Sequence, residues 1–269
     1  MRLTRYHQIV GGAALAGVLI VLFCTGTTRW LLLSLLCTLA GLCVGLGVSF
    51  PRWEMFGQSV WRIRTDRKAV ALTFDDGPDP ETTPQLLTLL AERGVRATFF
   101  CVGRRVAQYS DLGRRFVAEG HEVENHSQGH SHWTNLFSPR RLRADLIAAQ
   151  REIQSVTGRV PLYFRPPMCL TNPRVFRVAG ELGLRVTTYT ARGLDRRPDP
   201  PDRIAARLLR HLQPGAILLL HDGGVPAERL LAVVKLLLDR LQAEGYQCVR
   251  LDELTAGGKP PVDNGRFLG

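Results

Sequence analysis

Two adjacent carboxylates, Asp75 and Asp76, directly follow a short apolar run and precede a Gly-Pro turn. The run, residues 69–74, is rich in β-forming residues and is bounded by charge and turn residues, so it predicts a buried strand. Catalytic groups of parallel α/β folds usually lie at the carboxyl ends of the strands. Because successive strand residues point to opposite sides, one carboxylate can hold a metal while the other handles a proton. On this stretch alone, an Asp-Gly turn with solvated acids is an equally good interpretation.

Two histidines form a second group that could bind a metal. His126 and His130 are four residues apart, and on a helical turn this spacing places both imidazoles on one face. Neutral imidazoles together with a carboxylate are ordinary ligands for zinc. The pair alone is weak evidence, since two exposed loop histidines, of the kind that His132 illustrates, would give the same pattern.

Further polar groups follow other predicted strands. Arg165 ends an apolar run and is held extended by the proline after it, and its guanidinium suits bidentate binding of a carboxylate. His221 and Asp222 end another apolar run, and Asp195 follows a third. Because the carboxyl ends of parallel strands meet at one edge of a sheet, polar groups that end five strand-like units favour a single active site.

Short β-rich runs alternate with helical stretches from residue 68 onward, which predicts a parallel sheet with right-handed crossovers. Strands are expected at Ala69–Phe74, Ala97–Val102, His121–Glu124, Leu162–Arg165, Arg185–Thr190, Ala216–His221 and Gln247–Leu251. Helices are expected at Thr83–Arg93, Asp111–Glu119, Pro139–Thr157, Pro173–Leu182, Asp202–Leu212 and Pro226–Glu244. Seven such units can close as a barrel.

Two uncharged apolar runs, residues 9–24 and 30–50, precede the α/β region. Each is near the roughly 20 residues of a membrane-spanning helix, so they predict a transmembrane hairpin with a tight turn at Gly26–Arg29. Basic residues flank the hairpin at both ends, whereas the turn carries only Arg29, so the positive-inside rule places both termini on the cytoplasmic side. A cleaved signal peptide is the alternative for the first run; if only one run spans, the domain lies on the opposite side.

The composition narrows the class of protein. The chain has 269 residues and a formal net charge of +11, but its basic residues are scattered and not interleaved with aromatics. This pattern argues against nucleic-acid binding and favours a basic face near an anionic membrane. The six cysteines form no C-x-x-C motif, which argues against a thiolate zinc site. We expect an anchor over residues 1–52, a juxtamembrane linker over 53–67, a catalytic domain over 68–255 and a flexible tail over 256–269.

Taken in chain order, the motifs TFDDGP, HxxxH, RPP, Asp195 and LLHD resemble those of the polysaccharide deacetylases with a NodB-homology domain, carbohydrate esterase family 4. The resemblance covers about residues 68–252. It implies a distorted (β/α) barrel, so that together with the apolar runs we expect an α/β protein whose barrel follows a transmembrane helical hairpin. It also implies a metal-dependent hydrolase that removes N-acetyl, or sometimes O-acetyl, groups from sugars. Combined with the predicted membrane hairpin, it leads us to expect a membrane enzyme that acts on an amino sugar of a glycan or on a lipid-linked sugar.

The resemblance further implies a role for each motif residue. The implied metal ligands are Asp76, His126 and His130. The implied catalytic residues are Asp75 as general base, Arg165 orienting it, His221 as general acid and Asp195 tuning that acid. The implied substrate contacts are Leu219 and Pro167. Zinc is the expected cofactor, with cobalt, nickel or another divalent ion as alternatives.

Four positions depart from the pattern usual in that family. Glu124 and Cys169 stand where glycine is usual, Arg192 lies near a usual aspartate, and Arg196 replaces a tryptophan. These changes alter the predicted wall of the substrate pocket. The competing hypothesis is a carbohydrate-binding or scaffold protein of the same fold that has lost catalysis.

Overall fold

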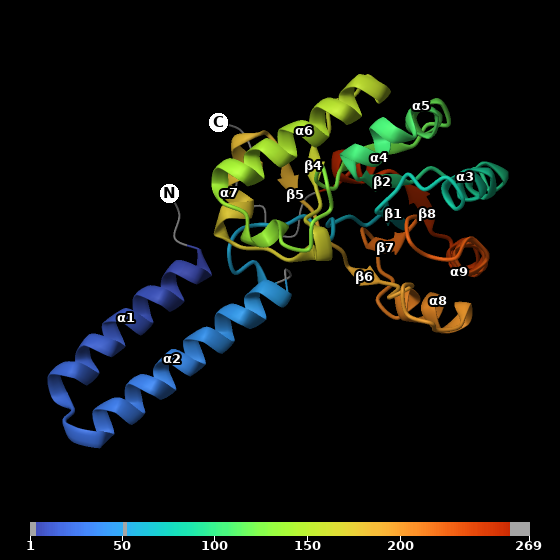
Figure 1. The fold of residues 1–269 in the computed structure, drawn as a ribbon. Helices are drawn as coiled ribbons and strands as arrows, with labels where there is room; N and C mark the ends of the chain where they lie inside the picture. Colours follow the sequence, from blue (N-terminus) through green and yellow to red (C-terminus); the bar gives the residue numbers. More distant parts are fainter. Residues whose placement is uncertain (1–3, 51–52, 259–269) are drawn as a thin grey trace.

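The structure is a computed structural model that describes residues 4–50 and 53–258. A hairpin of two long helices projects from an α/β domain in which helices surround a central sheet (Figure 1). The hairpin comprises α1 (Arg5–Phe23) and α2 (Gly26–Ser49). Both are long and apolar enough to cross a membrane, and Gly47 is the one buried residue described in either helix.

The turn between the two helices is shorter than predicted. Only Cys24 and Thr25 separate α1 from α2, and the predicted turn residues Gly26–Arg29 form the first helical turn of α2 instead. The side chain of Arg29 stabilises the junction, because its Nε donates to the carbonyl of Cys24 at 2.7 Å. This bond satisfies a carbonyl at the C-terminal end of α1 that has no partner within the helix.

The base of the hairpin packs on the segment that follows it. The amide of Tyr6 donates to the carbonyl of Met55 at 2.9 Å, and the Tyr6 ring lies 5.5 Å from that of Phe56. Met55 also covers Gly47, where an added Cβ would lie 2.7 Å from the methionine side chain. A larger residue at position 47 would therefore displace this contact.

Within the described residues the sheet has eight strands, and all of its strand pairs are parallel. The strands are β1 (Ala69–Asp75), β2 (Thr98–Cys101), β3 (Glu122–Asn125), β4 (Tyr163–Phe164), β5 (Arg185–Val186), β6 (Ala191–Arg192), β7 (Ile217–His221) and β8 (Gln247–Val249). Their order is β5-β4-β3-β2-β1-β7-β6, and β8 pairs with the start of β1. This parallel, curved sheet confirms the predicted distorted (β/α) barrel.

Within the predicted strand Arg185–Thr190, Arg185–Val186 alone forms a strand, β5, because another segment pairs with the residues that follow it, and β6 begins beyond the predicted range at Ala191. Val60 forms a parallel bridge with Thr187, and the amide of Thr188 donates to the Val60 carbonyl at 3.0 Å. Arg62 forms a bridge with Ala216, just before β7. Residues 60–62, which lie within the predicted linker, thus pair with the segment after β5 and with the residue before β7.

Helices cover the outside of the sheet (Figure 1). They are α3 (Thr83–Glu92), α4 (Gly103–Gln108), α5 (Ser110–Ala118), α6 (Pro139–Thr157), α7 (Pro173–Glu181), α8 (Pro201–Leu209), α9 (Ala227–Ala243) and α10 (Leu251–Ala256). The sequence did not predict α4 or α10. The start of α6 is set by Ser138, whose Oγ accepts from the amide of Arg141, and its end by Gly158 at φ 70°.

The main core lies between the sheet and these helices. Phe74 and Phe99 stack on adjacent strands with ring centroids 5.2 Å apart, and Phe116 of α5 lies 4.2 Å from Phe99. All three are fully buried, and burying such a side chain contributes about 2 kcal/mol. This packing holds β1 and β2 rigidly, and both strands end at the candidate site.

Candidate active site

The predicted polar residues meet at the carboxyl edge of the sheet. Asp75 is the last residue of β1 and lies opposite His221, the last residue of β7. Asn125 of β3 lies opposite Phe164 of β4, which brings His126 and Arg165, the residues that directly follow these two strands, side by side. The parallel register therefore gathers groups that are up to about 150 residues apart in the chain.

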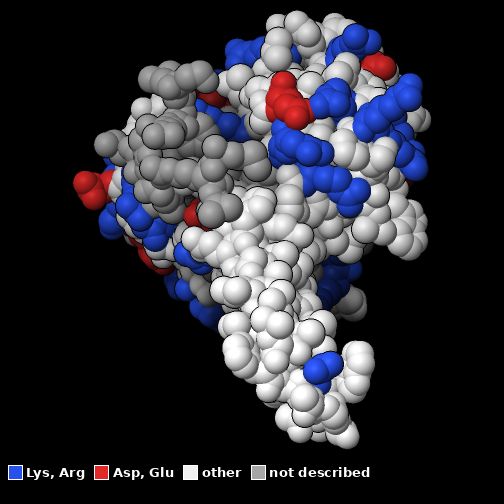
Figure 2. All heavy atoms as spheres, turned by 90° about the vertical axis from the view of Figure 1, so that its left-hand side faces the viewer, with Lys and Arg blue, Asp and Glu red and all other residues white. Residues whose placement is uncertain are grey.

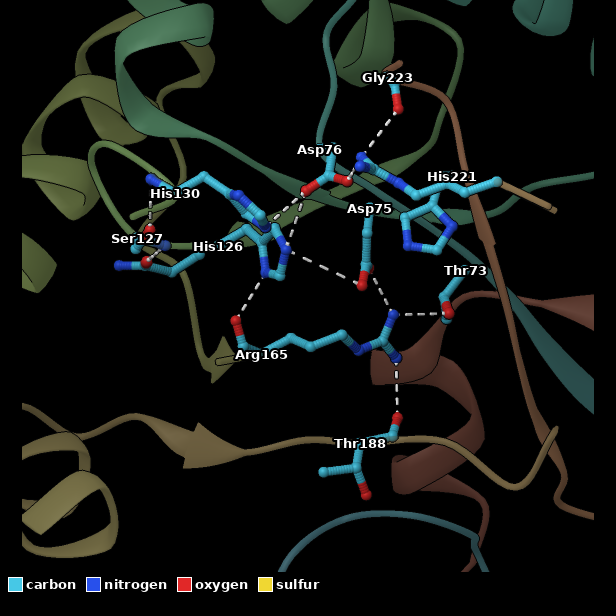
Figure 3. Close-up of polar contacts among 12 residues, drawn as sticks. Thr73, Asp75, Asp76, His126, Ser127, His130, Arg165, Thr188, His221 and Gly223 are labelled. Atoms are coloured by element: carbon cyan, nitrogen blue, oxygen red, sulfur yellow. Dashed lines mark hydrogen bonds and ion pairs between the residues drawn. The ribbon is translucent and has the colours of Figure 1, made fainter. Parts of the chain in front are cut away.

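Asp76, His126 and His130 form a compact set of possible metal ligands. Oδ1 of Asp76 lies 3.2 Å from Nε2 of His126 and 2.9 Å from Nε2 of His130, as Figure 3 shows. The ligand atoms of the three residues all lie within 4.8 Å of one another. His132 does not join them, and its ring packs edge-on to that of His130.

A loop rather than a helical turn brings the two histidines together. His126 and His130 follow β3, and Ser127, at φ 70°, reverses the chain between them. The amide of Ser127 donates to Oδ1 of Asn125 at 2.8 Å, and the amide of His130 donates to Oγ of Ser127 at 2.9 Å. The spacing of four predicted the neighbourhood correctly, but its helical explanation was wrong.

The three ligand groups fit a divalent cation. Nδ1 of His126 lies 2.6 Å from the carbonyl of Arg165, to which it donates, so Nε2 presents a lone pair toward Asp76. Oδ1 of Asp76 is buried and receives no hydrogen bond from any described group. Two acceptors that face each other in a buried place require a cation or a proton between them, and two imidazoles with one carboxylate are a usual zinc set.

Arg165 holds Asp75 from below. The guanidinium is fully buried and donates to Oδ1 of Asp75 at 2.6 Å, to Oγ1 of Thr73 at 2.9 Å and to the carbonyl of Thr188 at 2.9 Å (Figure 3). It also stacks 3.9 Å from the ring of Phe100. A buried charge with this many partners fixes the Asp75 carboxylate in one orientation.

His221 has a carboxylate partner of its own. Oδ1 of Asp195 lies 2.8 Å from Nδ1 of His221, and Oδ2 accepts from the His221 amide at 2.8 Å. Burial acts to lower the pKa of His221, but the hydrogen bond and charge of Asp195, together with the charge of Asp75, outweigh it and raise that pKa. Asp195 therefore favours the protonated imidazole.

Asp222 supports the turn that carries the two carboxylates, a role that no sequence pattern predicted. It is fully buried, its amide donates to the Asp75 carbonyl at 3.1 Å, and its Oδ2 accepts from Oγ1 of Thr83 at 2.7 Å. A Cβ at Gly77 would lie 2.1 Å from that carboxylate oxygen, which explains the glycine of the motif. Burial raises the pKa of Asp222 to about 7.

The backbone around the site is strained. The residues other than glycine that adopt a positive φ here are Asp76, Ser127, His130, Met168, Cys169 and Leu194. Each costs of the order of 1–3 kcal/mol, and such residues concentrate at functional sites. Cys169 has φ 55°, a conformation that glycine adopts without strain. This backbone conformation explains why glycine is usual at this position in the family that the motifs resemble.

A cavity of about 390 Å³ opens above these groups. Leu219 lines it as predicted, whereas Pro167 does not, because Pro167 is buried at the start of a 3-10 turn whose other residues, Met168 and Cys169, reach the cavity. Three arginines line the same cavity, namely Arg192, Arg196 and Arg197. They bring a basic wall to the site that the resemblance did not predict.

Two of the departures from the family pattern have clear contacts. Arg196 forms an ion pair with Oδ2 of Asp76 and donates to the carbonyl of Gly223, so it holds the carboxylate oxygen that faces away from the histidines. Oε2 of Glu124 accepts from the amides of Leu162 and Tyr163 at 2.8 and 2.6 Å. Glu124 therefore fixes the start of β4, the strand that leads to Arg165.

A metal-ligand set, a fixed carboxylate and a supported histidine around one cavity are typical of metal-dependent hydrolases. Comparison with known proteins identifies the family. A family model described as polysaccharide deacetylase matches residues 62–187. A peptidoglycan-N-acetylglucosamine deacetylase of Bacillus cereus is 34% identical over 208 residues, which are 75% of this chain and 94% of the relative. The chain belongs to the polysaccharide deacetylase family.

Solved structures agree with this assignment. A family 4 acetyl xylan esterase from Clostridium thermocellum, in complex with a cobalt ion, superposes with a TM-score of 0.65 at 34% identity, covering 70% of this chain and 90% of the esterase. A carbohydrate esterase family 4 pseudoenzyme from Bacillus anthracis has a TM-score of 0.68 at 26% identity, covering 74% of this chain and 69% of the other. The fold is thus shared by enzymes and by at least one pseudoenzyme.

Proposed function

We propose that this protein hydrolyses the N-acetyl group of an amino-sugar residue with the help of a divalent metal held by Asp76, His126 and His130. The proposal depends on one observation. Asp75, which is paired with Arg165, and the candidate metal ligands line the same cavity. When bound, such a metal would polarise the amide carbonyl and lower the pKa of a water molecule. Zinc suits the ligand set, and the cobalt of the esterase from Clostridium thermocellum supports a divalent ion.

Asp75 is proposed to remove the proton from the attacking water. Arg165 occupies Oδ1 of this carboxylate, so Oδ2 remains as the proton acceptor, and it lies 3.9 Å from Nε2 of His126 on the side of the ligand set. The fixed orientation means that no rearrangement of the base is needed before proton transfer. Asp76, the next residue, is then free to act only as a ligand.

His221 is proposed to supply the proton that the departing amine needs. Its Nδ1 is engaged by Asp195, so Nε2 is the nitrogen available to the cavity that the side chain lines. The raised pKa keeps a larger fraction of this imidazole protonated near neutral pH than an isolated histidine would have. Base and acid thus come from the adjacent carboxyl ends of two paired parallel strands, β1 and β7.

The test is acetate release from N-acetylated sugars, for example chitooligosaccharides, by the full chain in detergent or lipid. We expect release that a chelator abolishes and a divalent metal restores. A binding or scaffold protein that has lost catalysis, as the pseudoenzyme neighbour has, would bind sugar without releasing acetate under any metal condition. That result would overturn the proposal.

We further propose that the hairpin of α1 and α2 anchors the protein in a membrane with both termini on the cytoplasmic side. Basic residues flank the hairpin at Arg2, Arg5 and Arg62, while its turn carries only Arg29. A topology reporter fused after Gly269 tests this orientation. A cytoplasmic signal is expected, and an extracytoplasmic signal would refute the orientation without affecting the proposed chemistry.

A further inference from the structure

A second cavity joins the active site to the end of the hairpin. It has a volume of about 290 Å³ and shares three lining residues with the active-site cavity, namely Tyr189, Arg192 and Leu194. At its other end it is lined by Ser49, the last residue of α2, and by Phe50. One wall therefore runs from the C-terminal end of an apolar helix to the site of the proposed chemistry.

The end of α2 has the character of a membrane interface. Phe50 and Trp53 are both substantially exposed, and their rings stack at 5.7 Å. Exposed aromatic rings at the end of a long apolar helix typically lie at the level of the lipid headgroups. Figure 2 shows Lys and Arg side chains on the face of the domain around the base of the projecting hairpin. The second cavity thus opens where lipid phosphates would lie.

The lining of this cavity combines apolar and basic groups. Phe50, Tyr189, Ala191 and Leu194 supply the apolar side, and the basic side consists of Arg192, Arg207 and His211. No described residue that lines it is acidic. Such a lining is suited to a molecule with a hydrocarbon part and an anionic part rather than to a neutral sugar chain.

Arg192 is the cation available at the junction of the two cavities. Arg207 is engaged by Asp199, with Nη2 and Oδ2 2.6 Å apart, and also donates to the carbonyl of Gly193. Arg192 is exposed and forms no ion pair with any carboxylate in the described part of the chain; its guanidinium lies 5.6 Å from the centre of the Tyr189 ring. Its guanidinium is therefore available to bind a phosphate that lies where the two cavities meet.

We propose that the second cavity receives the lipid-phosphate part of the substrate, so that the site acts on an N-acetylated amino sugar linked through phosphate to a lipid. The sugar occupies the active-site cavity, its phosphate is bound by Arg192, and the hydrocarbon chain passes Phe50 into the bilayer. This inference rests on the proposed deacetylation and specifies its substrate class.

The test compares acetate release by the full chain, reconstituted in phosphatidylcholine vesicles, from three N-acetylglucosamine probes. The first is a polyprenyl-phosphate-linked sugar incorporated in the vesicles, the second is the water-soluble sugar 1-phosphate, and the third is a neutral chitooligosaccharide. We expect kcat/KM for the lipid-linked probe to exceed that for each soluble probe by at least about tenfold. R192Q should lower the ratio of lipid-linked to neutral kcat/KM about tenfold, since it removes one charge-assisted hydrogen bond.

R151Q is the matched control, because Arg151 is an exposed arginine of α6 that lines neither cavity. It should leave the ratio unchanged. Equal kcat/KM for the sugar 1-phosphate and the lipid-linked probe overturns the lipid part of the inference, and equal values for all three probes overturn it entirely while deacetylation stands. Release from none of the probes overturns the proposed function, and the inference falls with it.

Discussion

Nη1 of Arg165 lies 2.6 Å from Oδ1 of Asp75, at a point in the structure where neither side chain is exposed to more than a few per cent. The neighbouring carboxylate, that of Asp76, turns instead toward two histidines. Two consecutive acids therefore have separate partners and separate proposed tasks. The ion pair with Arg165 is what distinguishes the proposed base from the proposed ligand.

Removing this arginine should destabilise the protein strongly. R165M leaves the buried Asp75 carboxylate without its counter-charge, and we expect the free energy of unfolding to fall by about 3 kcal/mol. D75N, made in parallel, removes the charge from the other partner. In urea denaturation the double variant should lose clearly less stability than the sum of the two single variants, since they remove the same interaction. Additive losses would contradict a direct pairing of the two residues.

Metal binding should depend on His126 but not on His132. A divalent ion such as zinc at 100 times its dissociation constant stabilises a one-site protein by about 2.7 kcal/mol, which is about 5–10 °C in Tm for a domain of this size. Differential scanning fluorimetry should show this increase for the native protein and for H132A, and not for H126A. His132 is a matched control, because it lies beside His130 yet outside the ligand set. An unchanged increase in H126A would refute the proposed ligand.

The pH dependence of activity should report the support that Asp195 gives to His221. Asp195 raises the pKa of His221, so D195N should lower it. A proton donor with a lower pKa is protonated in a smaller fraction of molecules at each alkaline pH, so the alkaline limb of kcat/KM should move to lower pH. The profile of D239N, a variant in an exposed pair with Arg93, should match the native one. An unmoved limb in D195N would exclude His221 as the titrating acid.

Sequence patterns predicted which site residues stand at the carboxyl ends of strands. Asp75, Arg165 and His221 each follow an apolar run, and the parallel sheet brings them together as expected. The helical explanation of the histidine pair was wrong because Ser127 adopts a left-handed backbone conformation that the spacing does not reveal. The candidate ligands His126 and His130 still lie together, because the loop after β3 brings both side chains to Asp76.

Long-range packing explains the features that the sequence did not reveal. The early end of β5 within the predicted strand Arg185–Thr190 depends on Val60, more than 120 positions earlier in the chain, and no local pattern reports this contact. The support that Asp222 gives to the turn depends on Thr83 and on the absence of a side chain at Gly77. The contact of Arg196 with Asp76 likewise joins residues 120 positions apart. Each of these contacts joins residues that are far apart in the chain rather than within one element.

Metal-dependent hydrolysis with Asp75 as its base can be tested by a metal titration of chelator-treated native protein and D75N, with acetate release and bound metal measured in the same samples. We expect both proteins to bind one metal ion per chain, acetate release by the native protein to rise with metal occupancy, and D75N to release acetate at least about 100-fold more slowly. Undiminished release by metal-loaded D75N would contradict the role of Asp75 as the base, and undiminished release by native protein without metal would contradict the metal dependence.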